Sequence, residues 1–275
     1  MKVKPVVYHV PCTIFRDYLK VDALRRERIL SDVLFHAMYR EWLRLDKITD
    51  EEKRFDAACA NIGMNKPCMK ITDAIERGKE LWNAGINEAC FSIGGDLLRK
   101  HMDKHEEQTD EERALFVAYL ALGSILGNKE YTKTNILMWL SRMDGSTQVK
   151  KPFRANCATF TPPVEKYYTS IDKNGNRKKS FYKTRRLRAL LYEYYGVSSY
   201  ADGVRGFYFS LTMDMEELVK AVKEKKSDSA LSKFNEAKKK ALESSTHDCI
   251  HDCNHMLNRD CNHDCNLKCI TLKNR

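Results

Sequence analysis

The 275-residue chain lacks a long uncharged hydrophobic run, and its longest uncharged stretch is Ala114–Asn128. A membrane-spanning helix needs roughly 20 consecutive apolar residues, so we expect no such helix and no membrane partner. The first residues, MKVKPVVYHVP, have a short apolar run but no small-residue cleavage pattern of a signal peptide. These absences predict a cytoplasmic protein whose cysteines are reduced thiols.

Short motifs that identify common enzyme classes are also missing. There is no Walker A loop, no HExxH zinc motif, no GxSxG nucleophile turn and no Rossmann glycine fingerprint. We interpret Tyr167, Tyr168 and Tyr182 as strand-packing or backbone-contacting residues rather than as nucleophiles. The sequence therefore predicts a protein without catalytic residues and without a required cofactor.

Positive charge is concentrated in one segment, Lys150–Tyr192. The whole chain has 48 Lys and Arg against 38 Asp and Glu, a net charge of +10. This segment alone contains twelve cations and two acids, Glu165 and Asp172, so it accounts for the entire excess. Segregated positive charge is typical of a protein that binds a polyanion, and nucleic acid is the first candidate.

The basic segment has a pattern of its own and is not a featureless tail. β-Prone residues in 164–172, an Asn174-Gly175 turn and a return strand over 178–182 predict a hairpin. From Lys183 the pattern becomes helical until Gly196. The apolar face of this basic helix consists of Leu187, Leu190, Leu191 and Tyr194.

Two further strands are expected after the basic helix. They are 197–200 and 204–211, joined near Asp202-Gly203. Alternation along the second strand predicts that Phe207 and Phe209 pack on the basic helix. Arg205, close to the turn, is expected to reach a phosphate.

A basic helix followed by a two-stranded hairpin resembles the recognition half of a winged-helix or helix-turn-helix DNA-binding domain. Upstream, a capping box at Thr109–Glu112, the apolar run 114–122 and a helix through 136–143 resemble its first two helices. The resemblance covers residues 109–212 at the level of the superfamily. It departs from the compact pattern because 146–182 separates the second and third helices. Either this is an inserted hairpin, or 110–144 is only core.

This resemblance implies duplex DNA binding without catalysis, by a transcription regulator or a replication-initiation protein. Three arginines, Arg185, Arg186 and Arg188, are expected at guanine edges because a guanidinium fork binds guanine bidentately. The alternatives are a solvated basic helix, an RNA-binding module and a protein-interaction scaffold with an acidic partner. The complete set of expected nucleic-acid contacts is Arg177, Lys178, Lys179, Lys183, Arg185, Arg186, Arg188 and Arg205.

The fold class we predict is mainly α with small β-hairpins. Residues 1–107 form a helical N-terminal region, with a strand over 3–10. The stretch 91–96 leads into a helix that extends to about residue 105, and its Gly94-Gly95 is interpreted as a plain turn. Residues 108–212 form the winged-helix-like domain. Residues 213–245 contain amphipathic helices at 214–225 and 229–242, for which dimerisation is one interpretation. Residues 246–275 form a disordered tail.

The tail is unusual because Cys and His recur at intervals of about four residues. Thiolate and imidazole are the ligands that zinc prefers, but paired C-x₂-C knuckles are absent. A structural zinc site, weak adventitious metal binding and an inert tail therefore remain three interpretations. The expected ligands are His247, Cys249, His251, Cys253, Cys261, His263, Cys265 and Cys269.

Five cysteines lie outside the tail and have no nearby His in the sequence. We interpret them as small hydrophobic residues. They are Cys12, Cys59, Cys68, Cys90 and Cys157.

Overall fold

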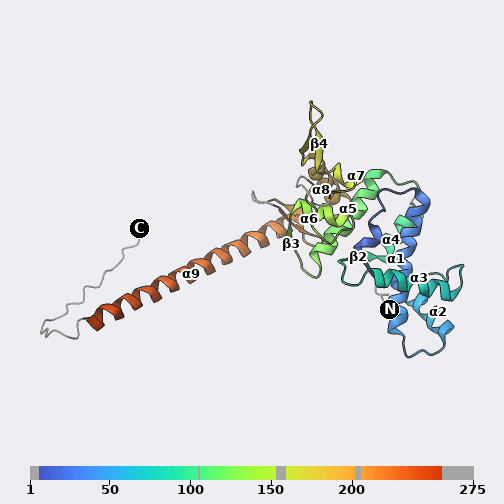
Figure 1. Cartoon of the computed structure of the whole chain (residues 1–275), viewed down its shortest axis with the longest axis horizontal. Helices are drawn as coiled ribbons and strands as arrows, with labels where there is room; N and C mark the ends of the chain where they lie inside the picture. Colours follow the sequence, from blue (N-terminus) through green and yellow to red (C-terminus); the bar gives the residue numbers. More distant parts are fainter. Residues whose placement is uncertain (1–5, 105, 153–158, 202–205, 256–275) are drawn as a thin grey trace. The chain divides into compact units, whose positions relative to one another are not determined.

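The computed structural model describes residues 6–104, 106–152, 159–201 and 206–255, with side chains as far as residue 236 and at residue 239. This part of the chain is mainly helical with small antiparallel sheets, which confirms the predicted fold class (Figure 1). Contacts group the chain into two units, residues 1–220 and residues 221–275. Within the described ranges, every helix is too short or too polar to cross a membrane.

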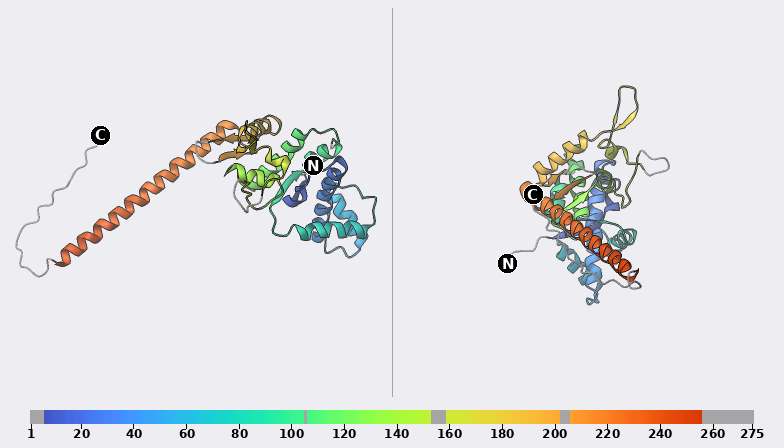
Figure 2. Two further views of the ribbon diagram at one scale, coloured as in Figure 1. Left: turned by 45° about the horizontal axis from the view of Figure 1, so that its top comes forward. Right: turned by 90° about the vertical axis from the view of Figure 1, so that its left-hand side faces the viewer.

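The N-terminal part, blue to cyan in Figure 2, is largely helical, as predicted. Its helices begin and end at residue types that commonly cap helices. Asp22 and Asp50 accept hydrogen bonds from backbone N–H groups of their own first turns, and Gly63 ends its helix with φ +68°. The elements are β1 (Val7–Pro11), the 3₁₀ helix η1 (Cys12–Phe15), α1 (Ala23–Arg44), α2 (Glu51–Ile62), α3 (Ile71–Ala84), β2 (Cys90–Gly94) and α4 (Gly95–Asp103).

The strand β2, which ends in the Gly94-Gly95 turn before α4, was not predicted from the sequence. It pairs antiparallel with β1, so that Tyr8 lies opposite Ile93 and Val10 opposite Phe91. These four side chains are buried and point to one face of the two-stranded sheet. The sequence did not indicate this strand because the pairing partner of β2 lies about 80 residues earlier in the chain, which a local pattern does not reveal.

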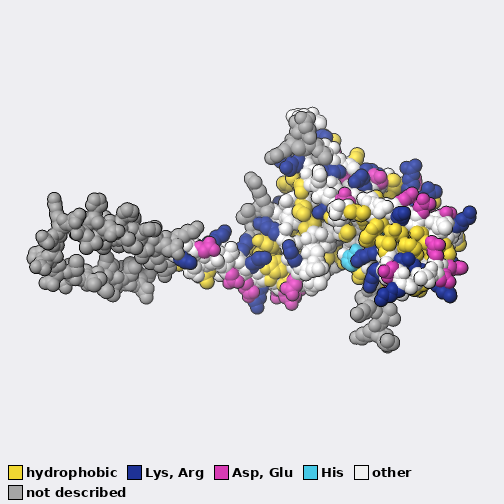
Figure 3. Space-filling model, turned by 60° about the horizontal axis from the view of Figure 1, so that its bottom comes forward, with side chains coloured by type: hydrophobic (Ala, Val, Ile, Leu, Met, Phe, Trp, Pro, Cys, Tyr) yellow, Lys and Arg dark blue, Asp and Glu magenta, His cyan; other side chains and the backbone are white. Residues whose placement is uncertain are grey.

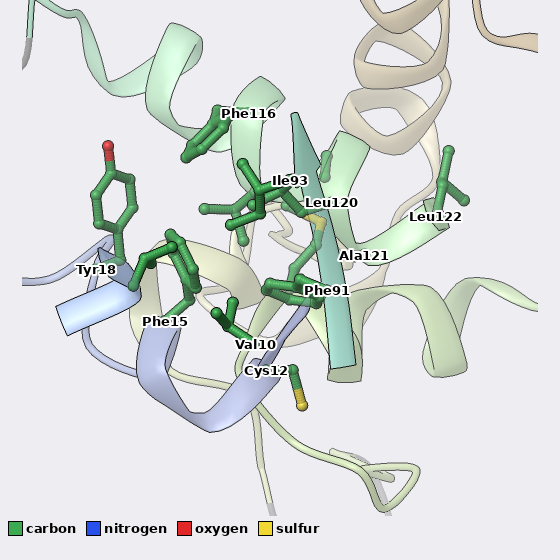
Figure 4. Close-up of a cluster of buried hydrophobic side chains, with 14 of the residues drawn as sticks. Val10, Cys12, Phe15, Tyr18, Phe91, Ile93, Phe116, Leu120, Ala121 and Leu122 are labelled. Atoms are coloured by element: carbon green, nitrogen blue, oxygen red, sulfur yellow. The ribbon is translucent and has the colours of Figure 1, made fainter. Parts of the chain in front are cut away.

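A single hydrophobic cluster extends from Tyr8 in β1 to Phe209 in the C-terminal hairpin. Its centre is α5 (Asp110–Leu126), which is buried along most of its length. Figure 4 shows side chains of β1, η1, β2 and α5 converging there. The ring of Phe15 lies 5.5 Å from that of Phe91 and 6.0 Å from that of Phe116. The boundary predicted between residues 107 and 108 stays a prediction.

The middle of the chain contains short elements around α5. Three of its strands form an antiparallel sheet in the order β3-β7-β6, and β4 pairs with β5 in a separate hairpin. The elements are β3 (Thr132–Thr134), α6 (Ile136–Met143), α7 (Pro162–Glu165), β4 (Thr169–Ile171), β5 (Arg177–Lys179), α8 (Tyr182–Tyr195), β6 (Ser198–Tyr200) and β7 (Phe207–Ser210).

The β4–β5 hairpin is shorter than predicted, because β4 begins at residue 169 instead of 164 and β5 ends at residue 179 instead of 182. Its Asn-Gly turn is confirmed, with Gly175 at φ +79°. Tyr167 and Tyr168 precede β4 and are buried in the core, so they do not belong to a strand. Tyr182 is the first residue of α8 and is 73% exposed, so its predicted place in a return strand was wrong.

The C-terminal part contains one helix, α9 (Met215–His255), instead of two helices followed by a tail from residue 246. Neither Pro nor Gly occurs in this segment, so nothing in the sequence stops the helix between the two predicted ones. The part of the predicted tail from residue 256 onward lies outside the described residues. Leu231 and Phe234 are exposed on α9. Dimerisation through this helix stays a prediction.

Candidate nucleic-acid interface

Helix α8 is held in the core by one face. Leu187 and Leu191 are almost fully buried on that face, and Thr184 beside them donates its hydroxyl to the carbonyl oxygen of Tyr167. Gly196, at φ +66°, ends the helix where the sequence predicted. The buried face fixes the rotation of α8 about its own axis and so decides which side chains point to solvent.

The opposite face of α8 carries a stripe that we name the α8 stripe: Tyr182, Arg185, Ala189 and Tyr192. These residues follow one another at intervals of three, four and three, so they share one side of the helix. All four are exposed, the tyrosines by 73% and 56%. The α8 stripe therefore offers one cation, one methyl group and two aromatic rings together.

The three arginines expected at guanine edges have different surroundings. Arg185 is exposed within the α8 stripe. Arg186 lies beside the stripe and forms an ion pair with Glu111, with Nε and Oε1 3.2 Å apart. Arg188 lies on the other side and is half-buried, and burial, with the nearby charge of Arg185, lowers its guanidinium pKa. Of the three, Arg185 is therefore best placed to meet a base.

The ion pair of Arg186 with Glu111 does not prevent a further contact. Both side chains are about half exposed, and exposed pairs contribute about 0–1 kcal/mol to stability. A phosphate could therefore replace the carboxylate of Glu111 at little cost. Lys183 is also exposed and lies in the first turn of α8.

The β3-β7-β6 sheet has a buried and an outer face; β3 precedes α8 in the chain, and β6 and β7 follow it. Phe207 and Phe209 are buried, as predicted, and the ring of Phe207 lies 5.6 Å from that of Trp139. Lys133 and Tyr200 lie opposite Tyr208 in the strand register, one on each side, so the three side chains form a row on the outer face.

The row on the outer face was not anticipated from the sequence. The ammonium of Lys133 lies 5.3 Å from the ring centroid of Tyr208. β3 has only three residues and no apolar alternation, so nothing local signals a strand there. Arg205, for which a phosphate contact was predicted, lies outside the described residues.

The other predicted cations are on the β4–β5 hairpin. Arg177, Lys178 and Lys179 occupy β5, and all three are exposed. Arg177 forms an ion pair with Glu165. The structure thus places every described cation of the predicted set on two adjoining elements, β5 and α8.

Over the N-terminal helices, cations and acids are mixed. Lys and Arg lie beside Asp and Glu on the face that Figure 3 shows. Examples are the ion pairs of Arg77 with Asp32 and of Lys66 with Asp56. The segregation of charge seen in the sequence therefore distinguishes α8 and β5 from the N-terminal part.

The predicted zinc ligands cannot be assembled into a site here. Four of the predicted ligands belong to the α9 backbone, but their side chains lie outside the described part of the structure: His247, Cys249, His251 and Cys253. The other four lie wholly outside the described residues. Elsewhere in the described residues, no three His, Cys, Asp or Glu side chains are grouped to hold a metal ion. Zinc binding stays a prediction.

Two of the five remaining cysteines match their interpretation as small hydrophobic residues. Cys12 and Cys59 are buried, and burial raises the pKa of both thiols. Cys68 and Cys90 are exposed, so this interpretation was wrong for them. Cys68 lies in the loop between α2 and α3 and Cys90 is the first residue of β2, and at such positions hydrophobic type alone does not decide exposure. Cys157 lies outside the described residues.

Comparison with known proteins identifies no relative. No family model, no curated protein and no solved structure matches this chain. The interpretation of the α8 stripe and the neighbouring sheet therefore rests on the chemistry and geometry of these residues.

Proposed function

We propose that this chain binds duplex DNA through the α8 stripe and the outer face of the β3-β7-β6 sheet, without catalysing a reaction. The observation that carries the proposal is the stripe itself, an exposed row of Arg185, Ala189 and two tyrosines on a helix whose other face is buried. An α-helix fits the major groove, where arginine pairs with guanine and a methyl group contacts thymine.

The order of the elements supports a winged-helix arrangement. α5, β3, α6, α8, β6 and β7 occur in this order as helix, strand, two helices and two strands, with α7 and the β4–β5 hairpin between α6 and α8. β3 joins the β6–β7 hairpin at the β7 edge, as the first strand of a winged helix does. In this arrangement α8 is the recognition helix, and the β4–β5 hairpin is an insertion between the second and third helices.

The outer face of the sheet is suited to the neighbouring phosphates. Lys133 brings a positive charge to this face, and Tyr200 and Tyr208 bring hydroxyl groups that donate hydrogen bonds. These residues extend the predicted contact set beyond Arg205. Phosphate contacts position a protein on the duplex, whereas the α8 stripe would supply sequence preference.

Duplex recognition is common to both roles that the sequence left open, a transcription regulator and a replication-initiation protein. The test is a selection from random duplexes with the purified chain, followed by titration of the selected site. Arg185→Ala should weaken binding to that site by about fivefold or more, since a bidentate guanine contact is worth about 1–3 kcal/mol. Arg28→Ala, which removes an exposed arginine of α1, is the matched control.

Three results would contradict the proposal. Equal binding by Arg185→Ala and wild type would remove α8 from the interface. Preference for single-stranded or duplex RNA over DNA would favour an RNA-binding module. Failure of wild type to bind any nucleic acid would favour the protein-interaction scaffold.

A further inference from the structure

The β4–β5 hairpin projects away from the helices that carry it (Figures 1 and 2). Every residue in 173–179 is exposed. No contact with the core explains this segment, because the hairpin's three paired positions, Thr169–Ile171 with Arg177–Lys179, contact chiefly each other. Packing on the core therefore does not explain why this exposed, projecting hairpin is present in the most basic part of the chain.

The base of the hairpin is fixed to α8. The amide of Ser180 donates to the carbonyl oxygen of Tyr168 at 2.8 Å, and the ring of Phe181 lies 5.8 Å from that of Tyr168. On the other strand, the hydroxyl of Thr169 donates to the carbonyl oxygen of Glu165 at 3.1 Å. The first strand is thus anchored to the end of α7, and Ser180 and Phe181, which directly precede α8, hold the second strand to Tyr168. Thr184 of α8 in turn donates its hydroxyl to the carbonyl oxygen of Tyr167, so the base of the hairpin is joined to this helix.

The tip of the hairpin is also ordered by its own hydrogen bonds. One carboxylate oxygen of Asp172 accepts from the amides of Asn174 and Asn176, each at 2.9 Å. This carboxylate is therefore engaged within the turn. Lys173 and Lys178 are exposed, and no acidic side chain in the described part of the chain pairs with either. The hairpin consequently presents two unpaired ammonium groups on a preformed scaffold.

The β4–β5 hairpin and the β6–β7 hairpin lie at opposite ends of α8. β5 ends three residues before the first residue of α8, and β6 begins three residues after the last residue of α8. A helix of 14 residues is about 21 Å long, so the two hairpins leave from points separated by about that distance. The major groove admits an α-helix, so with α8 lying in it the two hairpins would start from opposite ends of the helix and could each meet phosphates beyond that end.

We propose that the β4–β5 hairpin is a second DNA-backbone arm, which holds the phosphates beside the N-terminal end of α8 through Lys173 and Lys178. This inference rests on the proposed function of α8. Lysine suits the role because its ammonium is a compact charge that binds phosphate without bidentate geometry. The arm therefore adds affinity and footprint length but no sequence preference.

The experiment measures binding of the full chain to its selected duplex over a range of salt concentrations. Lys173→Gln/Lys178→Gln removes both ammonium groups from exposed positions. Because each neutralised phosphate contributes about 0.9 to the log–log salt slope, the slope should become shallower by about 1.8. Lys47→Gln/Lys79→Gln, which removes two exposed lysines of the N-terminal part, should leave the slope unchanged.

A second readout separates a backbone arm from a base-reading one. The ranking of selected against mutated sites should be the same for the hairpin variant and wild type, and hydroxyl-radical protection should shorten on one side only. An unchanged slope and footprint would overturn the arm while leaving the function of α8 intact. A changed sequence ranking would overturn backbone binding. If wild type bound no duplex, the arm and the proposed function would both be wrong.

Discussion

The guanidinium of Arg188 lies over the ring of Phe207, with Cζ 4.8 Å from the ring centroid. This contact joins α8 to β7, and the same ring packs in a T-shaped arrangement against Trp139 of α6. A helix thought to read DNA is therefore fixed to its neighbouring sheet by one of its own arginines. Arg188 would act by positioning α8, whereas Arg185 would act by touching the duplex.

Replacing Arg188 should thus affect stability. Arg188→Ala should lower the free energy of unfolding by about 1–2 kcal/mol, because it removes both the cation–π contact and the packing of the side-chain stem. Arg188→Met keeps an unbranched apolar stem over the ring and should lose less. Urea denaturation of the three proteins measures the difference. Equal stability of wild type and Arg188→Ala would show that the contact does not join α8 to β7.

Phe209 and Tyr192 should separate folding from binding. Phe209 is fully buried, so Phe209→Ala should cost about 3–5 kcal/mol of stability. Tyr192 is 56% exposed, so Tyr192→Ala should change stability by less than about 0.5 kcal/mol while weakening duplex binding. Thermal melts and titrations of both variants measure the two effects. Should Tyr192→Ala unfold the domain and Phe209→Ala leave it stable, the faces of these elements would be reversed.

Local signals in the sequence predicted much of this fold. The capping box of Thr109 with Glu112 forms as predicted at the start of α5, and the Asn-Gly turn and the Gly196 helix end are also present. Each depends on residues within a few positions of one another, so a sequence pattern contains all the required information. The apolar spacing of α8 correctly predicted that Leu187 and Leu191 are buried, but Tyr194, which was predicted on the same face, is 63% exposed.

Long-range pairing accounts for what the sequence did not predict. β3 exists because Thr132–Thr134 pairs with Phe207–Phe209, more than 70 residues away. The same holds for the site, since Arg186 meets Glu111 and Arg188 meets Phe207 across the fold. The three arginines of α8 are therefore equivalent by charge and differ only in their tertiary partners, which the sequence pattern does not reveal.

Two buried histidines should make the fold sensitive to mild acid. Burial lowers the pKa of both His36 and His101 from 6.5 to about 4. A folded-state pKa below the unfolded value means that the neutral form is favoured on folding. The stability that the two neutral histidines contribute to the fold is therefore fully present above pH 6.5 and is lost as the pH falls from 6.5 toward about 4.

The urea midpoint should accordingly fall between pH 7 and pH 5, before most carboxylates take up protons. His36→Gln/His101→Gln should be less stable at pH 7 but show a shallower change over this interval. The comparison is made by urea titration at each pH with ionic strength held constant. A variant with the same pH dependence as wild type would mean that other groups cause the loss.

Deleting His247–Arg275 should leave the melting temperature and duplex binding nearly unchanged. This segment consists largely of polar tetrads and has too little apolar side chain to dock on a core. Mass spectrometry under non-denaturing conditions, with and without a chelator, measures bound zinc in the same preparations. Stoichiometric zinc in the full chain, together with lower stability after deletion, would instead establish a structural zinc site.

One cation of the basic segment should not contribute to DNA binding. Lys150 pairs with the buried carboxylate of Asp144, which also accepts a hydrogen bond from the amide of Thr161 at 3.1 Å. Removing one partner of a buried pair costs about 3–5 kcal/mol, because the other charge stays buried without compensation. Lys150→Met should therefore destabilise the fold, and Lys150→Met/Asp144→Asn should recover part of the loss. Below their melting temperatures both variants should keep the salt slope of wild type, since this ammonium neutralises a carboxylate and not a phosphate. A shallower slope for Lys150→Met, measured on folded protein, would place Lys150 on the duplex and require the pair with Asp144 to open on binding.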